Sequence, residues 1–514
     1  MPGVTRYLLV VLVVEYGLSK SGHCPIFVFW PVPKRIKVAR FQFMPAPVIS
    51  VAQMRAWEKA TWAARRTPDQ VISRVGHIIT TRIKALTRPG DFIVILAGKG
   101  HNGDDARQVV QNLADREVTL INVFEPELAL KEFNSLLSMP LSLVVDGLFG
   151  IGLNRPLNKA WVKLIERVNR TRFPILAVDV PSGLNADTGE PQGAAIQATV
   201  TLTLGAPKRG MLTANAWPYV GRLEVAPDIG LVTCPVTNEL QWTLAEDFIG
   251  YPPSRPVAGH KGSFGHLVIF AGSLGYHGAA VLAARGALCA QPGLVTVYTP
   301  ENVYLPIASQ LSSVMVRPWS PGSRLPETCT ALVFGPGLAH ADLPLELKRE
   351  LVGHWRQLRL PVVVDASGLE WLPSGNTSSK SIRLITPHPG EAARLLKTST
   401  VRVQADRVAA LRTLSRRWSN CHVVLKGHQT LIGRSKGGVY CNSSGNPSLA
   451  QGGSGDVLAG YLGGLLAQPA LAADSLTAIR FGVWQHGATA DRLSRRRTNW
   501  TIEDLFTVLG NETG

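Results

Sequence analysis

Short runs of Val, Ile and Leu alternate with helical stretches along the chain from about residue 50. In the first half, four such runs lie at residues 92–98, 119–124, 141–150 and 173–183, and three of them end in Gly. Continuous apolar runs of this kind are typical of parallel strands that helices cover on both faces. The pattern therefore predicts a doubly wound α/β domain.

A Pro/Gly-rich passage at residues 251–265 separates this block from a second α/β alternation. The second set of expected strands lies at residues 266–273, 294–300, 331–337, 361–367, 383–391 and 422–427. A chain of 514 residues exceeds the roughly 100–200 residues of one domain, so two domains are expected. We assign residues 45–240 to the first domain and 245–514 to the second. Residues 1–44 form an extension that is either non-native or disordered.

The charge, the apolar run near the N-terminus and the cysteines indicate which partners and which compartment to expect. The formal net charge is +17, but the Arg residues are scattered, so we expect no nucleic-acid partner. The apolar run at residues 7–14 is far below the roughly 20 residues of a membrane span, and no membrane partner is expected. The six cysteines form no CxxC pair, which fits a reducing compartment. We predict a cytoplasmic enzyme.

A glycine-rich loop follows the first predicted strand and precedes a helical stretch. Residues 98–103 satisfy GxGxxG, a spacing that suits a dinucleotide pyrophosphate. However, Asp104 and Asp105 follow immediately, and two carboxylates would repel a phosphate at that turn. We interpret the loop as a site for a cation or for a neutral, hydroxylated group.

Other polar residues lie at the ends of the next strands. Because ligands of open α/β sheets bind outside the carboxyl ends of the strands, these residues can face one crevice. The set consists of Asn102, Asp105, Asp146, Asp179 and Ser182. Such oxygen-rich strand ends suggest a hard cation, with one carboxylate left as a general base. The alternative is that each aspartate only caps the following helix.

Five segments in order resemble the epimerase domain of the bifunctional NAD(P)H-hydrate repair enzymes. They are MRAWE (54–58), GKGHNGDD (98–105), DGLFGIGL (146–153), DVPSGLNADTGE (179–190) and TLTLGAPKRGML (201–212). The resemblance covers about residues 48–235 and implies a Rossmann-like domain. It implies that the hydrated cofactor contacts His101, Asn102, Gly103, Asp104, Asp105, Gly150, Ile151, Gly152, Leu153, Asn154, Arg155, Pro156 and Asp179. It also implies a potassium ion at Asn102, Asp146 and Ser182.

Two residues of this domain carry specific expectations. Asp179 is our choice for the catalytic base that moves a proton during epimerisation at the hydrated carbon. Asp104 occupies a position where the family usually has a glycine, which normally allows close backbone approach. We therefore expect the substitution to affect epimerase activity more than the fold.

The second domain contains another glycine-rich loop, QGGSGD at residues 451–456, before a helical stretch with small residues on one side. Backbone N–H groups at such a helix N-terminus can bind a transferring phosphoryl group, and Asp456 in the first turn can act as a base. The alternative is an ordinary turn. Other strand ends supply Lys426–Thr430, His388 and Glu391 to the same crevice.

This second set resembles the ribokinase-like superfamily, and more closely the ADP/ATP-dependent NAD(P)H-hydrate dehydratases, over about residues 250–510. The resemblance implies that adenine nucleotide binds at Lys426, Gly427, His428, Gln429, Thr430 and Gly455. It implies that the hydrated cofactor contacts Ala279, Gly337, His388 and Asp456. ADP or ATP would be the co-substrate, with Mg²⁺, and we expect a homo-oligomer.

The two resemblances together predict a metabolite-repair enzyme. The first domain would interconvert the R and S forms of hydrated NADH and NADPH. The second would phosphorylate the hydroxyl of the S form, with Asp456 as the base, and phosphate would then leave. Two alternatives remain: a ribokinase-like kinase of a small molecule such as a vitamin, and a first domain that only binds ligands.

Overall fold

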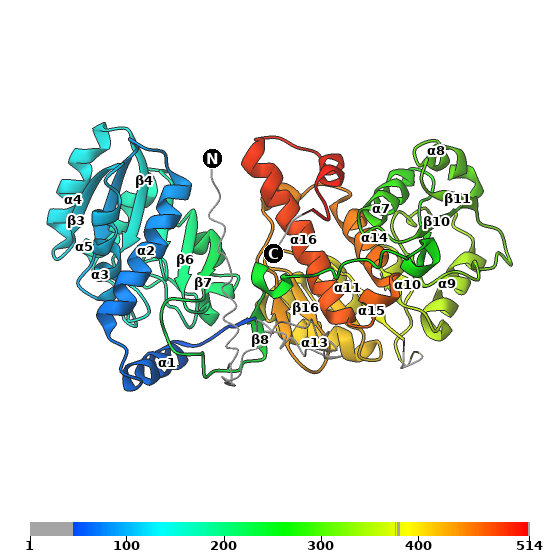
Figure 1. Cartoon of the computed structure of the whole chain (residues 1–514), viewed down its shortest axis with the longest axis horizontal. Coiled ribbons are helices and arrows are strands. Elements are labelled where there is room, and N and C mark those ends of the chain that lie inside the picture. The colour runs from blue at the N-terminus through cyan, green and yellow to red at the C-terminus, as the bar shows by residue number, and fades with distance from the viewer. Residues whose placement is uncertain (1–44, 376, 378–380, 512–514) are drawn as a thin grey trace, which may run out of the picture. The chain divides into compact units, whose positions relative to one another are not determined.

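The computed structural model describes residues 45–375, 377 and 381–511. The predicted extension at residues 1–44 lies outside this range. Both predicted α/β blocks form largely parallel sheets with helices on each face (Figure 1). The predicted α/β fold class is confirmed, and the expected strands are present in both blocks.

The first sheet has six parallel strands in the order β3-β2-β4-β5-β6-β7. Their bounds are Phe92–Ala97 (β2), Glu117–Asn122 (β3), Leu141–Gly147 (β4), Ile175–Val178 (β5), Val200–Leu204 (β6) and Arg222–Ala226 (β7). The order reverses at β2, because β3 lies on one side of it and β4 on the other. A crevice therefore opens at the carboxyl ends of β2 and β4, where α/β proteins bind ligands.

The side chains of β2 alternate between the two faces of this sheet, and both faces are buried. Ile93 and Ile95 pack on one face, and Val94 and Leu96 pack on the other. The first face is covered by α1 (Val51–Ala63), α2 (Pro68–Leu86) and α3 (His101–Gln108). The second is covered by α4 (Pro126–Ser135) and α5 (Lys159–Arg170). Both faces being apolar explains the unbroken Val/Ile/Leu runs of the sequence.

The second sheet has eleven strands in the order β1-β8-β17-β16-β15-β14-β13-β12-β9-β10-β11. Their bounds are Ala46–Pro47 (β1), Leu240–Trp242 (β8), His266–Phe270 (β9), Leu294–Thr299 (β10), Met315–Pro318 (β11), Ala331–Phe334 (β12), Val362–Val364 (β13), Arg383–Ile385 (β14), His422–Leu425 (β15), Leu431–Gly433 (β16) and Val439–Cys441 (β17). The strands from β15 to β11 are parallel, whereas β16 is antiparallel to both its neighbours. The parallel part holds the predicted strand ends at one edge.

Six longer helices cover the second sheet. One face packs against α7 (His277–Cys289), α14 (Ser454–Leu466) and α16 (Ser475–Arg496). The other packs against α9 (Leu345–Gln357), α11 (Pro389–Leu396) and α13 (Arg407–Arg417). Among the described residues, no helix is long and apolar enough to cross a membrane.

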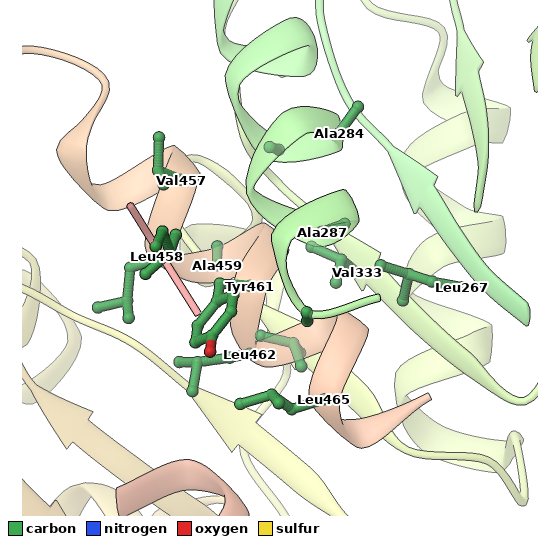
Figure 2. Packing of buried hydrophobic residues seen from close by; sticks show 14 of the residues in the cluster. Leu267, Ala284, Ala287, Val333, Val457, Leu458, Ala459, Tyr461, Leu462 and Leu465 are labelled. Carbon is green, nitrogen blue, oxygen red and sulfur yellow. The ribbon is translucent and has the colours of Figure 1, made fainter. Parts of the chain in front are cut away.

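Small residues let α7 and α14 approach closely (Figure 2). A Cβ atom added at Gly460 would lie 1.8 Å from the carbonyl oxygen of Ala283, and one added at Gly286 would lie 2.3 Å from that of Val457. No side chain fits at these distances, so the glycines set the spacing of the two helices. This packing fixes the N-terminus of α14, which carries Asp456.

Shorter helical segments complete the fold. The short α-helices are α6 (Trp217–Val220), α8 (Tyr304–Ala308), α10 (Gly368–Trp371), α12 (Thr400–Ala405) and α15 (Pro469–Ala472). The 3₁₀ turns lie at Val110–Asn112, Leu136–Ser138, Arg209–Leu212, Ala245–Phe248, Lys261–Phe264, Glu301–Val303, Pro447–Leu449 and Ile502–Thr507.

Candidate active sites

A cavity of about 1030 Å³ opens at the carboxyl ends of β2 and β4. It gathers most of the residues that the sequence predicted for the hydrated cofactor. Its lining includes His101, Asn102, Asp105, Gly150, Ile151, Gly152, Leu153, Asn154, Arg155, Pro156 and Asp179. Segments from three separate strand ends therefore meet in one place, as expected for an open α/β sheet.

Gly103 and Asp104 do not line this cavity. A Cβ atom at Gly103 would lie 2.0 Å from the carbonyl oxygen of Gly98. Glycine is therefore needed here because the two backbone segments lie so close together. Asp104 lies in the first turn of α3, and its side chain pairs with Arg107 at 2.8 Å on the outer side. Because Asp104 adopts ordinary helical backbone, its position does not require glycine.

Asp179 directs a carboxylate to the cavity wall. Its backbone φ is +63°, a strained value for a non-glycine residue that occurs preferentially at functional sites. Its Oδ1 accepts hydrogen bonds from the Leu204 N–H at 3.0 Å and from the ammonium of Lys208, which is fully buried. The ion pair supplies a positive charge that would otherwise be missing around this buried carboxylate.

Two further carboxyl groups line the same cavity. Burial raises the pKa of Asp105 to about 8, with smaller contributions from the charges of Asp179, Asp104 and Glu58. Burial, followed by the charge of Asp179, also raises the pKa of Glu58. A cavity wall that holds a Lys-paired carboxylate beside a neutral carboxylic acid has the parts of an acid–base pair.

The three predicted potassium ligands cluster around the backbone of Phe149. The Asn102 amide donates to the Phe149 carbonyl at 3.0 Å, and the Phe149 N–H donates to the Ser182 hydroxyl at 2.8 Å. That hydroxyl in turn donates to Asp146 at 2.6 Å. Asp146 is fully buried, and burial raises its pKa to about 6. Asp146 and Ser182 lie behind the cavity wall rather than on it.

The second site lies at the N-terminus of α14. Asp456 is in its first turn, and Lys426, at the end of β15, donates to Asp365 at 2.7 Å. An added Cβ at Gly455 would lie 3.2 Å from the Lys426 ammonium and 3.6 Å from Asp365. The glycine loop, the lysine and two carboxylates therefore converge on one helix N-terminus.

The electrostatics of this cluster centre on Asp456. Burial raises the pKa of its carboxyl to about 7; Asp365 and Glu391 add to the rise, and Lys426 opposes it. Glu391 is buried in the first turn of α11, where it accepts from the His388 N–H at 2.8 Å. A carboxylate that titrates near pH 7 suits a base that must both accept and release a proton.

The predicted nucleotide-binding residues form the loop after β15. Gly427 has φ +126° and Gln429 has φ +53°, and both polar atoms of the buried Gln429 amide lack a partner among the described residues. Arg407 holds the loop by donating to the carbonyl oxygens of His428 at 2.6 Å and Gln429 at 3.1 Å. A buried amide without partners is costly unless a ligand or water satisfies it.

The remaining predicted residues of this site lie on the neighbouring strand ends. Gly337 follows β12 with φ +64°, and an added Cβ there would lie 2.8 Å from the Cβ of Ala279 in α7. His388 caps α11 through its Nδ1, and its side chain is half exposed. A second cavity, of about 760 Å³, contains none of the predicted site residues and lies toward the C-terminal ends of α7 and α14.

Three residues that shape the sites were not predicted from the sequence: Lys208, Glu58 and Asp365. Lys208 and Glu58 lie inside the quoted segments TLTLGAPKRGML and MRAWE, but neither follows a predicted strand. Asp365 follows β13 directly, as Asp146 and Asp179 end or follow their strands. Asp365 could therefore have been identified from its place at a strand end.

The geometry defines a two-site α/β enzyme class, with an acid-lined cavity in one domain and, in the other, a helix N-terminus on which a glycine loop, a lysine and carboxylates converge. The family model for NAD(P)H-hydrate dehydratase matches residues 267–509, and the YjeF-related protein N-terminus model matches residues 121–210. The chain belongs to the family of bifunctional NAD(P)H-hydrate repair enzymes. This membership supports the repair function over the predicted alternatives.

Relatives align over both domains. The chain is 35% identical to the bifunctional NAD(P)H-hydrate repair enzyme of Gloeobacter violaceus, over 90% of this chain and 96% of that enzyme. It is 34% identical to the Escherichia coli enzyme of the same name, over 81% of this chain and 84% of that enzyme. Among solved structures, the ADP/ATP-dependent NAD(P)H-hydrate dehydratase of Bacillus subtilis, co-crystallised with ATP and Mg²⁺, is 28% identical, with a TM-score of 0.46 over 52% of this chain and 95% of that one.

Proposed function

We propose that the chain restores hydrated NADH and NADPH by epimerising the R and S forms and dehydrating the S form at the expense of ADP or ATP. The observation that carries this proposal is the match to repair enzymes across both domains, so that both sites belong to one chain. The convergence of acids in each site supplies the chemistry that the two reactions need.

In the epimerase domain, the cavity lined by residues 150–156 binds the hydrated nicotinamide. Asp179 is the base that removes a proton at the hydrated carbon, and Lys208 orients it. Asp105 is neutral at pH 7, because its pKa is about 8, and can donate a proton from the same wall. Inverting the configuration leaves the atoms of the ring unchanged, so no co-substrate is required for this half of the reaction.

The donors around Phe149 fit a potassium ion. Asn102, Asp146 and Ser182 offer an amide oxygen, a carboxylate and a hydroxyl, which are hard oxygen ligands. A buried carboxylate with a raised pKa lacks a cation of its own, and a monovalent ion would supply it. When bound, the ion stabilises the ionised form of Asp146. The ion and Asp146 would thereby hold residues 148–149 at the cavity wall.

In the dehydratase domain, the hydroxyl oxygen of the S hydrate attacks the terminal phosphorus of the nucleotide. Asp456 accepts the hydroxyl proton, and the bond between phosphorus and the nucleoside phosphate breaks. The N–H groups at the start of α14 and the Lys426 ammonium receive the developing negative charge. Phosphate then leaves the ring with loss of a proton from the neighbouring carbon, which restores the dihydropyridine.

Magnesium is compatible with this second site. Glu391 is a buried carboxylate beside Lys426 and Asp456, and Mg²⁺ is commonly held by one or two carboxylates together with substrate phosphates. When bound, the ion neutralises phosphate charge in the transition state. His388, Ala279 and Gly337 would contact the hydrated nicotinamide, and Lys426–Thr430 with Gly455 would contact the nucleotide.

The proposal is tested by following dihydronicotinamide absorbance when the purified chain is incubated with hydrated NADH and ADP or ATP. We expect absorbance to return, with phosphate released in equal amount. Asp456→Asn should abolish the recovery, and Asp342→Asn, an exposed position, should not. Absence of recovery with either nucleotide, while an unrelated alcohol is phosphorylated, would contradict the assignment.

We further propose that the enzyme works in the cytoplasm as a homo-oligomer. The six cysteines without a CxxC pair fit a reducing compartment. Light scattering of the full chain measures the oligomeric state, and a monomer at working concentration would contradict that part of the proposal.

A further inference from the structure

One short segment of the epimerase domain contacts both nucleotide-binding loops of the dehydratase domain. This segment comprises α6 and the start of β7, residues 217–222. We infer that residues 217–222 hold these loops in their binding conformation, so that nucleotide affinity depends on the fused first domain. The inference rests on the proposed nucleotide site. The experiment below distinguishes a failure of the inference from a failure of that site.

The first contact reaches the loop after β15. The indole of Trp217 meets the imidazole of His428 edge to face, with ring centroids 5.1 Å apart. The guanidinium of Arg407 lies 5.8 Å from the centre of the same indole. Arg407 is the residue whose hydrogen bonds fix the carbonyl groups of His428 and Gln429. Trp217 therefore packs against both the loop and the side chain that organises it.

The loop needs such support because of its backbone. Gln429 has a left-handed conformation that is unfavourable for a non-glycine residue, and Gly427 has a positive φ as well. Strained conformations persist only where surrounding contacts fix them. Contacts from Arg407 fix the loop from inside the dehydratase domain, and Trp217 covers Arg407 from outside it.

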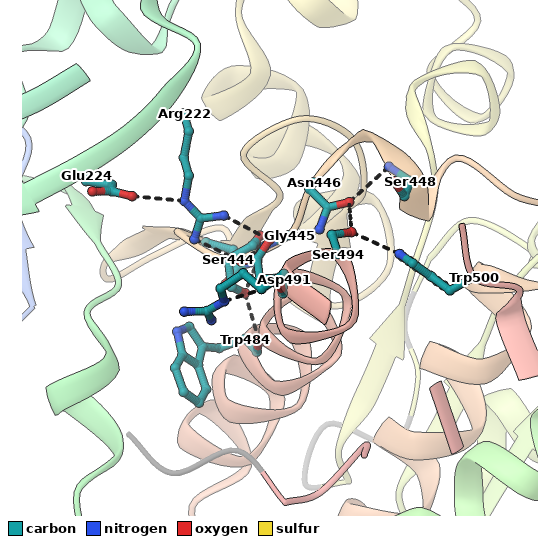
Figure 3. A network of polar contacts seen from close by, with 12 residues as sticks. Arg222, Glu224, Ser444, Gly445, Asn446, Ser448, Trp484, Asp491, Ser494 and Trp500 are labelled. Carbon is teal, nitrogen blue, oxygen red and sulfur yellow. Dashed lines mark hydrogen bonds and ion pairs between the residues drawn. The ribbon is translucent and has the colours of Figure 1, made fainter. Parts of the chain in front are cut away.

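The second contact reaches the loop that leads into α14 (Figure 3). Arg222 forms two contacts of 2.9 Å with the two carboxylate oxygens of Asp491, whose side chain is only 4% exposed. Asp491 also accepts hydrogen bonds from the Gly445 N–H and the Asn446 amide, each at 3.0 Å. A bidentate guanidinium–carboxylate pair is strong and directional. Arg222 thereby fixes the carboxylate that holds residues 445 and 446.

The hydrogen bonds continue toward the anion-binding turn. Asn446 caps the next turn by accepting from the Ser448 N–H at 3.0 Å, and Gln451 donates to the Ser448 carbonyl at 2.7 Å. Gln451 is the first residue of the glycine loop that ends at Asp456. The chain of contacts from Arg222 thus reaches the loop whose N–H groups are proposed to bind phosphate.

Kinetics of the full-length chain with the S hydrate test the inference. Arg222→Gln and Trp217→Leu should each raise the KM for ATP or ADP roughly five- to twentyfold with little change in kcat. Trp217→Phe keeps a ring and Arg222→Lys keeps the charge. Each should therefore bind nucleotide more tightly than Trp217→Leu or Arg222→Gln, respectively. The epimerase rate and the thermal unfolding midpoint of each variant report whether the fold is intact.

Two reference variants make the result decisive. Arg74→Gln removes an exposed ion pair with Asp228 elsewhere in the same domain and should leave the KM unchanged. Gly455→Ala should raise it by crowding Lys426. If Gly455→Ala raises the KM while Arg222→Gln and Trp217→Leu leave it within twofold, the role of residues 217–222 is wrong. If Gly455→Ala has no effect, the nucleotide site itself is wrong.

Discussion

Burial raises the pKa of a carboxyl group in each of the two sites. Asp105 and Asp456 have their pKa raised to about 8 and about 7, mainly because neighbouring atoms exclude water from them. Asp179 is as buried as Asp105, yet it has the Lys208 ammonium as a partner. Asp179 and Asp105 line one cavity wall, yet only Asp179 has a lysine as a direct partner, so the two similar aspartates can take different roles.

The pKa of Asp456 predicts the pH dependence of dehydration. Below about pH 7 the carboxyl is protonated and cannot accept a proton, so kcat should fall about tenfold for each pH unit. Asp365→Asn removes a charge that raises this pKa, and the acid limb should move to lower pH. Rates measured from pH 5 to 9 show the shift. Asp504→Asn, a variant of an aspartate outside this cluster, serves as the control; an unmoved limb in Asp365→Asn contradicts the coupling.

The pKa of Asp105 predicts how stability changes with pH. Between the unfolded value of 3.8 and the folded value of about 8, the folded state binds more protons than the unfolded state. The free energy of unfolding contributed by this group therefore decreases as pH rises through that window. Asp105→Asn should stabilise the chain by about 1–3 kcal/mol more at pH 9 than at pH 5.

Thermal unfolding at the two pH values measures this difference. Asp342→Asn, whose side chain is 89% exposed, should show none. Equal shifts for Asp105→Asn at pH 5 and pH 9 would mean that Asp105 is already ionised in the folded chain.

At the scale of elements, the spacing of α7 and α14 decides where the second site forms. Their close contact depends on glycines at which an added Cβ would clash with the backbone of the facing helix. Interiors packed to this density transmit even small changes in volume. A shift of α14 moves Asp456 together with the N–H groups proposed to bind phosphate, so helix packing and the proposed chemistry are linked.

Gly460→Ala tests this link. An added Cβ would lie 1.8 Å from the Ala283 carbonyl, so we expect a loss of about 1–3 kcal/mol in the free energy of unfolding, together with reduced dehydratase kcat. Gly353→Ala in α9 is the matched control, because nothing lies within 4 Å of its added Cβ. That change should stabilise the helix by about 0.5–1 kcal/mol. Equal effects of the two changes would show that helix spacing is not limiting.

The sequence predicted elements better than side-chain partners. Strands such as residues 92–97 were predictable because burial on both faces leaves an unbroken apolar run. The convergence of strand ends followed from parallel topology alone. The pairing of Lys208 with Asp179 did not, because it depends on how the chain returns after β6, and no local pattern encodes that path. The surroundings of Asp104 were not predictable for the same reason: whether a position faces the cavity or solvent depends on the orientation of α3.

For the whole molecule, the two sites act in series on one substrate. Only the S epimer of the hydrate is proposed to be dehydrated, so the epimerase must produce it from the R epimer. Uncatalysed epimerisation is the competing route. The fused chain is then useful to the extent that catalysed inversion outpaces spontaneous inversion.

Substituting one base at a time separates the two steps. With a mixture of R and S hydrates, Asp179→Asn should convert the S fraction at the normal rate and then slow at least tenfold, to the rate of spontaneous inversion. Asp456→Asn should invert either pure epimer without restoring absorbance. Chromatography of the epimers alongside absorbance follows both reactions. If Asp179→Asn consumes the R hydrate as fast as the unmodified chain does, another group is the base, and Glu58 on the same cavity wall would be the next residue to replace.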